Sequence, residues 1–383
     1  MTLKLVVAKH FLSILAISSI LFLSGCGGGG GENVIADNDD NNVIDNEFNN
    51  LVYSSYTDEN ANALVMARDD HVGHRYVLPS ISAYADIDKV PGQAATSVNR
   101  SGITSETAAI EFTTNGDPSA LPPEADYLIS VIDTDAEKSL SFSTVLADEP
   151  NPTTEWGGGV NEGDDYVGIV DTSNGTDKTV VFFDPNGFNG FDYQIFGVWS
   201  ESDEIDDLDV GLFSSGMRTD INDAINAPGD NFQEGIYSGR NNATGAWIDS
   251  AGNTWSVYGD FEATVNFARD LPTMDMTIGM TQAVDENDGP APDFVMGELD
   301  LESVNPITYD VNTGMFEGVV VMQDQREGAN YRHYRGNAAA TFYGPIAGNN
   351  VAPAELGGIT SLSGNGLETL GFSFGGRCQN CQN

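Results

Sequence analysis

The chain has 383 residues, in which 15 Lys and Arg face 58 Asp and Glu, so its formal net charge at pH 7 is −43. A charge of this sign repels nucleic acid and anionic lipid headgroups, which excludes both as binding partners. The acids are spread along the chain, so surface solubility explains them better than a single cationic partner does. The length fits two domains, or one large all-β domain with an appendage.

Residues 1–25 have the features of a bacterial lipoprotein signal peptide. Lys4 and Lys9 charge the start, and the apolar run Phe11 to Leu23 is too short for a spanning helix. The run ends in the sequence Leu-Ser-Gly-Cys, in which small residues precede Cys26. This pattern predicts that Cys26 is diacylated and becomes the new N-terminus. A plain secretory peptide with a chance cysteine is the alternative.

Residues 26–50 are predicted to form a flexible tether. Five glycines, Gly27–Gly31, lead into a segment rich in Asp and Asn, which buries too little apolar surface to offset its ordering entropy. Gly27 stands where an Asp usually retains a Gram-negative lipoprotein in the inner membrane. We therefore expect an outer-membrane protein held by its lipid anchor only.

Residues 51–190 are predicted to form a β-rich region. Short apolar or alternating runs such as YLISVID and TVVFFD are separated by Gly, Asn and Asp, which is typical of antiparallel sheets. His71 and His74 stand three apart beside two aspartates, which is one pattern for a metal clip. Surface polar residues are the preferred interpretation, and no metal or cofactor is expected.

Residues 191–383 continue the β pattern. The strand YQIFGVWS follows Asp192, and the sequence DSAGNTW (Asp249–Trp255) predicts a hairpin turn between two strands. Farther on, GMFEGVVVM precedes the segment GNAAATFYGPIAGNNVAPAELGG (Gly336–Gly358). Helical periodicity is nearly absent, so the fold class is all-β.

Several of these segments resemble the β-barrel domain of the transferrin-binding protein B family of surface lipoproteins. The matching elements are the Tyr-Ser-Gly strand (Tyr237–Gly239), the Gly-Asp-Phe strand (Gly259–Phe261) and the signature Phe-Tyr-Gly-Pro (Phe342–Pro345) with Glu-Leu-Gly-Gly (Glu355–Gly358). The resemblance covers roughly Tyr193 to Gly375. It implies an eight-stranded antiparallel barrel at the C-terminal end, preceded by a smaller handle-like β region at 51–190.

The signature is predicted to be structural, in a barrel whose interior is filled by side chains. Phe342 and Tyr343 point to opposite faces of one strand, so one ring fills the interior and the other covers the outside. Gly344 and Pro345 then end the strand, because proline has no N–H to donate. Gly357 and Gly358 let the returning strand pass where a Cβ would clash. A closed barrel has no unpaired edge, so we expect residues from about Asp192 onward to fold alone.

The segment NYRHYRGN precedes the signature strand and is our candidate for partner binding. It gathers Tyr331, Arg332, His333, Tyr334 and Arg335 in a chain that is poor in cations. Tyr and Arg are enriched at binding hot spots. A structural strand whose arginines pair with nearby acids is the favoured alternative.

Cys378 and Cys381 lie three apart near the end of the sequence. A Cys-x-x-Cys pair can be redox-active or form half of a zinc site. Here the expected compartment is oxidising and no second pair exists, which predicts a small disulfide.

No catalytic motif is found, and we name no catalytic residue. The sequence favours a non-enzymatic, surface-exposed lipoprotein of a Gram-negative outer membrane that binds a protein or small solute. By resemblance, its role would lie in metal or haem acquisition, with a TonB-dependent receptor as partner and a Slam-type translocator for export. A structural or adhesive envelope protein is the alternative.

Overall fold

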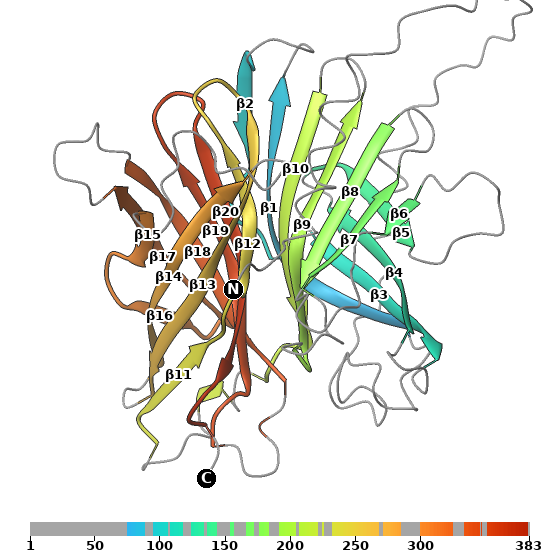
Figure 1. Cartoon of the computed structure of the whole chain (residues 1–383). Helices are drawn as coiled ribbons and strands as arrows, with labels where there is room; N and C mark the ends of the chain where they lie inside the picture. The colour runs from blue at the N-terminus through green and yellow to red at the C-terminus, as the bar shows by residue number, and fades with distance from the viewer. Residues whose placement is uncertain are drawn as a thin grey trace, which may run out of the picture.

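The structure is a computed structural model of the whole chain. It describes residues 75–88, 95–105, 108–117, 124–133, 136–143, 154–156, 166–171, 176–183, 191–203, 207–220, 224–225, 232–267, 271–284, 299–324, 333–344, 346 and 351–381. These residues form twenty β-strands, and only residues 224–225 are helical. The strands build two antiparallel sheets that lie side by side (Figure 1). The predicted all-β class is confirmed.

The first sheet, which we call the N-terminal sheet, contains ten strands in the order β5-β4-β3-β1-β10-β9-β8-β7-β6, with β2 paired to β1. Their bounds are β1 Arg75–Asp88, β2 Ser97–Arg100, β3 Ala108–Asp117, β4 Glu124–Asp133, β5 Lys138–Ser143, β6 Thr154–Trp156, β7 Tyr166–Asp171, β8 Thr176–Phe183, β9 Gln194–Asp203 and β10 Asp207–Gly216.

The N-terminal sheet is curled, because β1 has different neighbours along its length. Its first part, Arg75–Pro79, pairs with β3, and its second part, Ser80–Asp88, pairs with β10. The curl brings Lys138 at the start of β5 to the carboxylates of Glu201 and Asp209, each 2.6 Å from its Nζ atom. These ion pairs join a strand near one end of the sheet to two strands in its middle.

The second sheet is formed by the strands β11 Glu234–Ser238, β12 Ala243–Ile248, β13 Thr254–Asn266, β14 Thr273–Val284, β15 Leu299–Ser303, β16 Ile307–Asp310, β17 Met315–Asp324, β18 His333–Tyr343, β19 Glu355–Ser363 and β20 Thr369–Cys378. It closes on itself. Both β11 and β12 pair with β13 and β20, and both β15 and β16 pair with β14 and β17. The ten strands therefore fill eight positions, which confirms the predicted eight-stranded antiparallel barrel.

The sheet boundary falls later than the sequence indicates. The expected barrel region began at residue 191, but β9 and β10 pair with β8 and β1 of the N-terminal sheet. The barrel begins at Glu234. A local β pattern does not specify which strand a given strand pairs with. The strands β9 and β10 form a hairpin, and the strands on either side of it, β8 and β1, lie upstream in the sequence.

Three apolar clusters hold the molecule together. One fills the barrel and includes Phe261, Phe316 and Phe374. A second, with Trp199 and Phe213, lies inside the curl of the N-terminal sheet. The third lies between the two sheets and draws its residues from both. Accordingly, β12 and most of β19 and β20 are buried on both faces, whereas β16 alternates buried and exposed residues.

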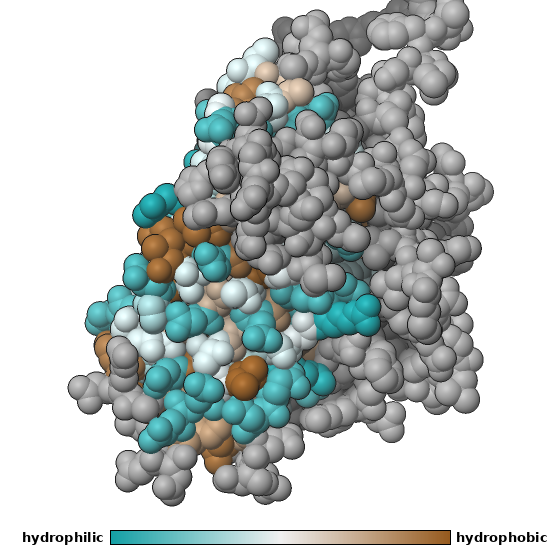
Figure 2. Space-filling view, turned by 60° about the vertical axis from the view of Figure 1, so that its left-hand side comes forward, coloured by the Kyte–Doolittle hydropathy of each residue, from teal (hydrophilic) through white to brown (hydrophobic). Residues whose placement is uncertain are grey.

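The outer face of the barrel that is turned away from the N-terminal sheet is mainly hydrophilic, with small scattered apolar areas (Figure 2). The exposed large hydrophobic residues among those described are Val304, Val311 and Val319, each at most 43% exposed. This face carries the strand alternation expected of a sheet with one solvated side.

Candidate functional site

The signature segment forms the joint between the two sheets. Phe342 is fully buried inside the barrel, where its ring contacts the rings of Tyr237 and Phe316. Tyr343 is also fully buried but points out of the barrel, and its hydroxyl lies 3.1 Å from the hydroxyl of Ser214 on β10. The prediction that the two rings take opposite faces is confirmed. The outer face at Tyr343 is the sheet-to-sheet contact.

Gly344 ends β18 in the left-handed region, with φ of 82°. Its N–H donates to the carbonyl of Met217 at 2.7 Å, and a Cβ there would enter the ring of Tyr193. Pro345 lies outside the described residues. On β19, a Cβ at Gly358 would collide with the carbonyl of Ala339, which agrees with the expected need for glycine. The two glycines thus allow close packing. Gly344 lets the segment with Tyr193, before β9, lie against the end of β18, and Gly358 lets β19 lie against β18.

Glu355, the first residue of Glu-Leu-Gly-Gly, is buried at this joint with 1% exposure. Its carboxyl oxygens accept hydrogen bonds from the backbone N–H groups of Asp192 at 2.7 Å and Tyr193 at 3.1 Å. Burial, helped by the nearby charge of Asp192, raises the pKa of Glu355 to about 8. Arg377 and the two N–H donors act in the opposite direction but do not cancel the burial. Glu355 therefore holds a proton at neutral pH while it links the barrel to the N-terminal sheet.

Stability is expected to fall as the pH rises from about 5 to 8.5. In the unfolded chain Glu355 titrates near 4.5, whereas in the folded protein it keeps its proton up to a pKa of about 8. The folded state binds more protons than the unfolded chain in this window. The free energy of unfolding therefore decreases as the pH rises to about 8, by at most about 1.4 kcal/mol per pH unit. Melting curves across the window measure this, with Glu355→Gln as the comparison. Parallel pH profiles of the two proteins would contradict the assignment.

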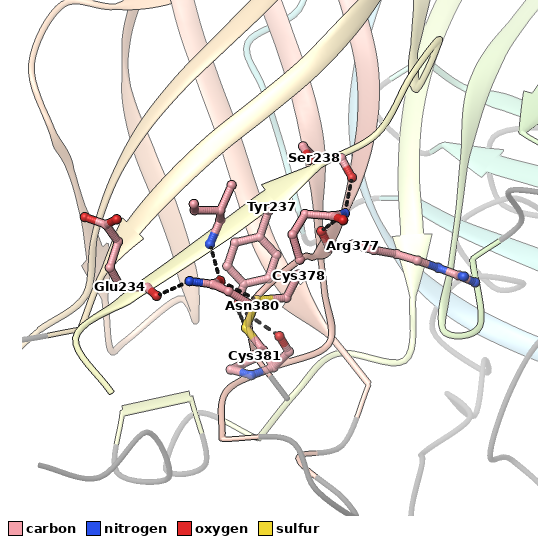
Figure 3. The surroundings of a disulfide bond; sticks show 10 residues. Glu234, Tyr237, Ser238, Arg377, Cys378, Asn380 and Cys381 are labelled. Carbon is pink, nitrogen blue, oxygen red and sulfur yellow. Dashed lines mark hydrogen bonds between the residues drawn. A yellow bond between two sulfur atoms is a disulfide. The ribbon is translucent and has the colours of Figure 1, made fainter. Parts of the chain in front are cut away.

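Cys378 and Cys381 form the expected disulfide, with their Cα atoms 5.5 Å apart. Figure 3 shows it beneath the ring of Tyr237, whose hydroxyl lies 3.9 Å from the Sγ of Cys381. The side chain of Asn380 accepts from the N–H of Ile236 at 2.9 Å and donates to the carbonyl of Glu234 at 2.9 Å. The C-terminal turn therefore fastens β20 to β11, which is a structural role.

The end of the barrel opposite the joint collects four connections between strands. We call it the loop end. Register places the flanking strand ends together, as the pairs Ile248–Thr369, Ser256–Val284, Leu299–Asp324, Gln323–His333 and Arg335–Ser363 show. The connections are residues 249–253, 285–298, 325–332 and 364–368. The tips of β1 and β2 reach the same end (Figure 1), where the N–H of Ala95 donates to the carbonyl of Ala251 at 3.2 Å.

The candidate partner-binding segment is divided between two environments at the loop end. Tyr331 and Arg332 lie outside the described residues, in the β17–β18 connection, and the side chain of His333 is also not described. Arg335 is exposed on the outer face of β18. Tyr334, by contrast, is fully buried in the barrel core, so its assignment as a binding residue is wrong. The strand alternation that exposes Arg335 turns Tyr334 inward.

Tyr334 closes the barrel interior at the loop end together with two tryptophans. The indole N–H of Trp247 donates to the Tyr334 hydroxyl at 2.9 Å, and Trp255 stacks on Trp247 with ring centroids 6.2 Å apart. Trp255 in turn donates to Asp249 at 3.2 Å. Burial raises the pKa of Asp249, but hydrogen bonds from Asn253, Trp255 and Ala251 outweigh it, so the pKa lies below the usual range. The DSAGNTW segment forms the predicted hairpin, but its role in closing the barrel had no recognisable sequence signal.

The described interior of the barrel is filled from end to end. Phe342, Tyr309 and Phe316 pack near the joint, and Trp247 and Tyr334 pack near the loop end, all within one buried cluster. A closed eight-stranded barrel is just wide enough for side chains to fill it. Ligand binding by this protein is therefore to be sought on the connections or between the sheets.

Other predicted sites fall outside the described part of the chain. These are the lipid-attachment residue Cys26 and the histidine pair His71 and His74. Among the described residues, no group of three His, Cys, Asp or Glu side chains is placed to hold a metal ion. The same residues form no helix that is long and apolar enough to cross a membrane.

No family model and no curated protein matches this chain. Among solved structures, HpuA from Kingella denitrificans in complex with human haemoglobin is 11% identical, with a TM-score of 0.39 over 86% of this chain and 93% of that one. The apo haemoglobin receptor HpuA from Kingella denitrificans is 12% identical, with a TM-score of 0.38 over the same shares. Transferrin binding protein B from serogroup B Neisseria meningitidis is 15% identical, with a TM-score of 0.32 over 74% of this chain and 59% of that chain.

Proposed function

We propose that the protein is a non-enzymatic receptor lipoprotein on the surface of a Gram-negative outer membrane, attached through Cys26. It captures a protein or a small solute in metal or haem acquisition. A TonB-dependent receptor takes over the captured cargo, and a Slam-type translocator exports the lipoprotein. The gathering of four connections over a filled, rigid barrel end is the observation that carries this proposal, and the sequence resemblance to transferrin-binding protein B supports it.

The loop end has the construction of a binding surface. Its support is fixed, because the strands below it are closed into a barrel and packed against the N-terminal sheet. Connections held by a rigid scaffold are where binding residues are most often found. By sequence, the 285–298 connection holds Phe294 and Met296, and the 325–332 connection holds Arg326, Tyr331 and Arg332. These are residue types that interfaces favour.

The proteins named in the comparisons suggest the probes. HpuA is described as a haemoglobin receptor and transferrin binding protein B by its transferrin binding. We expect the immobilised mature chain to bind human haemoglobin, human transferrin or free haemin in surface plasmon resonance. If the folded protein binds none of these three probes, a role in haem or iron capture is contradicted.

A double variant tests the place of binding. The double variant Tyr331→Ala, Arg332→Ala is expected to lower the affinity for the bound probe by roughly 30-fold or more, because one hot spot contributes about 2 kcal/mol of binding free energy. The matched control is Val311→Ser, a change of an exposed side chain at the opposite end of the barrel, and it should leave affinity unchanged. Equal affinities of the double variant and the native chain would show that the binding surface does not include the 325–332 connection.

A further inference from the structure

The β19–β20 connection, residues 364–368, carries the dipeptide Asn365-Gly366 at its tip. Both residues are exposed. Gly366 has a φ of 65°, in the left-handed region that glycine adopts readily, and a Cβ added there would meet no atom within 4 Å. The space around the peptide bond between the two residues is therefore open.

The ends of this turn are fixed by hydrogen bonds, whereas its tip is not. The N–H of Gly364 donates to the carbonyl of Glu368 at 2.9 Å, and the N–H of Glu368 donates to the carbonyl of Asn365 at 3.2 Å. Among the described residues, neither the side-chain amide of Asn365 nor the N–H of Gly366 has a hydrogen-bond partner. Exposed turns without such bonds open at almost no cost in free energy. The side chain of Asn365 can therefore approach the nitrogen of Gly366.

This arrangement meets the chemical needs of spontaneous asparagine deamidation. The backbone nitrogen of Gly366 loses its proton to solvent base and forms a bond to Cγ of Asn365, and the side-chain amide leaves as ammonia. Water then opens the cyclic imide at either carbonyl, which yields aspartate or isoaspartate. Glycine favours the ring closure because no Cβ shields its nitrogen. The reaction needs no oxidant, reductant or enzyme.

The same dipeptide occurs at Asn115-Gly116, in a setting that opposes the reaction. These residues lie in β3, where Asn115 pairs with Asp126 and Gly116 pairs with Ala125 on β4. The ladder holds this backbone extended, so it must open before the ring can close. The other Asn-Gly pairs of the sequence lie outside the described residues and begin at Asn174, Asn186 and Asn189.

The turn also carries a contact between the two sheets. Nη2 of Arg100, on β2, donates to the carbonyls of Leu367 and Glu368, each at 3.0 Å, and its Nε donates to the hydroxyl of Thr369. Isoaspartate routes the backbone through the former side chain of Asn365. It therefore lengthens the turn by one carbon just before the two carbonyls that Arg100 contacts, and displaces them from the guanidinium.

We propose that Asn365 is a site of spontaneous deamidation, and that its conversion weakens the contact of Arg100 with the barrel. The exposed tip of the connection gains a negative charge as the protein ages. Asn365 lies on one of the four connections of the loop end, but the reaction does not depend on what the loop end binds.

Peptide mapping by mass spectrometry tests the site on the mature chain, kept at physiological pH and temperature. The exchange of –NH2 for –OH is expected at Asn365 roughly tenfold faster than at Asn115, because the ladder protects Asn115. In concentrated urea the ladder is lost, so the two rates should converge. An amide that persists at Asn365, or equal rates at the two positions in the folded protein, would overturn the proposal.

Thermal unfolding of fresh and aged samples tests the effect on the contact between the sheets. The aged native chain is expected to melt at a lower temperature than the fresh one. Asn365→Gln would have to form a larger ring, so its melting temperature should not change with age. Arg100→Gln lacks the contact, so ageing should lower its melting temperature less.

Three results would overturn the link between Asn365 and Arg100. These are an unchanged melting temperature of the aged native chain, an equal decrease in aged Asn365→Gln, and an equal decrease in aged Arg100→Gln. If Arg100→Gln does not fold, the comparison of the native chain with Asn365→Gln still decides whether deamidation loosens the protein. None of these results bears on partner capture at the loop end.

Discussion

Replacing Tyr334 with alanine is expected to lower the free energy of unfolding by about 3–5 kcal/mol, the usual cost of removing a large aromatic side chain from a core. Tyr334 is fully buried, and its loss leaves a cavity under the loop end. It also removes the hydroxyl that accepts a hydrogen bond from the indole N–H of Trp247. Chemical denaturation of the native and variant proteins, followed by tryptophan fluorescence, measures the difference.

Two further substitutions separate the causes. Tyr334→Phe keeps the ring and removes the hydroxyl, so a loss of about 0.5–1.5 kcal/mol is expected for the hydrogen bond to Trp247. Arg335→Ala, on the exposed face of the same strand, should change stability by less than about 0.5 kcal/mol. A larger loss at Arg335 than at Tyr334 would mean that the register of β18 is misassigned.

A chain that contains only the barrel, residues 232–383, is expected to associate or precipitate. Without the N-terminal sheet it exposes the apolar residues that face that sheet. These are Ala246, Ile248, Tyr258, Val284, Met315, Ala339 and Ile359. A contiguous apolar face of this kind promotes association. Size-exclusion chromatography with light scattering measures the outcome, and residues 75–383 prepared in the same way are the control.

The same reasoning applies to a chain that begins at Asp192. Such a chain keeps the β9–β10 hairpin but lacks both of its outer neighbours, β8 and β1. The expectation from sequence that this part folds alone is therefore revised by the structure. A soluble monomer with cooperative unfolding, from either truncated chain, would show that the interface between the sheets is not needed.

The sequence was sufficient for features that depend on local pattern. Alternation and turn residues predicted strands, the hairpin at Asp249–Trp255 and the opposite faces of Phe342 and Tyr343. The disulfide was predicted from the expected oxidising compartment and the lack of a second cysteine pair. It was insufficient where a property depends on a distant partner. The pairing of β10 with β1 joins residues 119 to 135 positions apart, and no local signal reports it.

The candidate site shows the same division. Tyr334 and Arg335 were grouped because both residue types are common in interfaces, although adjacent residues on a strand face opposite sides. Arg100 was not singled out at all, since its partners Leu367 and Glu368 lie more than 260 positions away. The burial of Glu355 likewise depends on the loop before β9, which belongs to the other sheet.

The pairing of β20 with β12 closes the barrel, and β20 is the last strand among the residues that the structure describes. The barrel therefore cannot close until β20 is available to pair with β12. Contacts this far apart in sequence make folding slow, on the order of milliseconds to seconds for β proteins. Closure of the barrel is thus set to follow, and not to accompany, synthesis of its other strands.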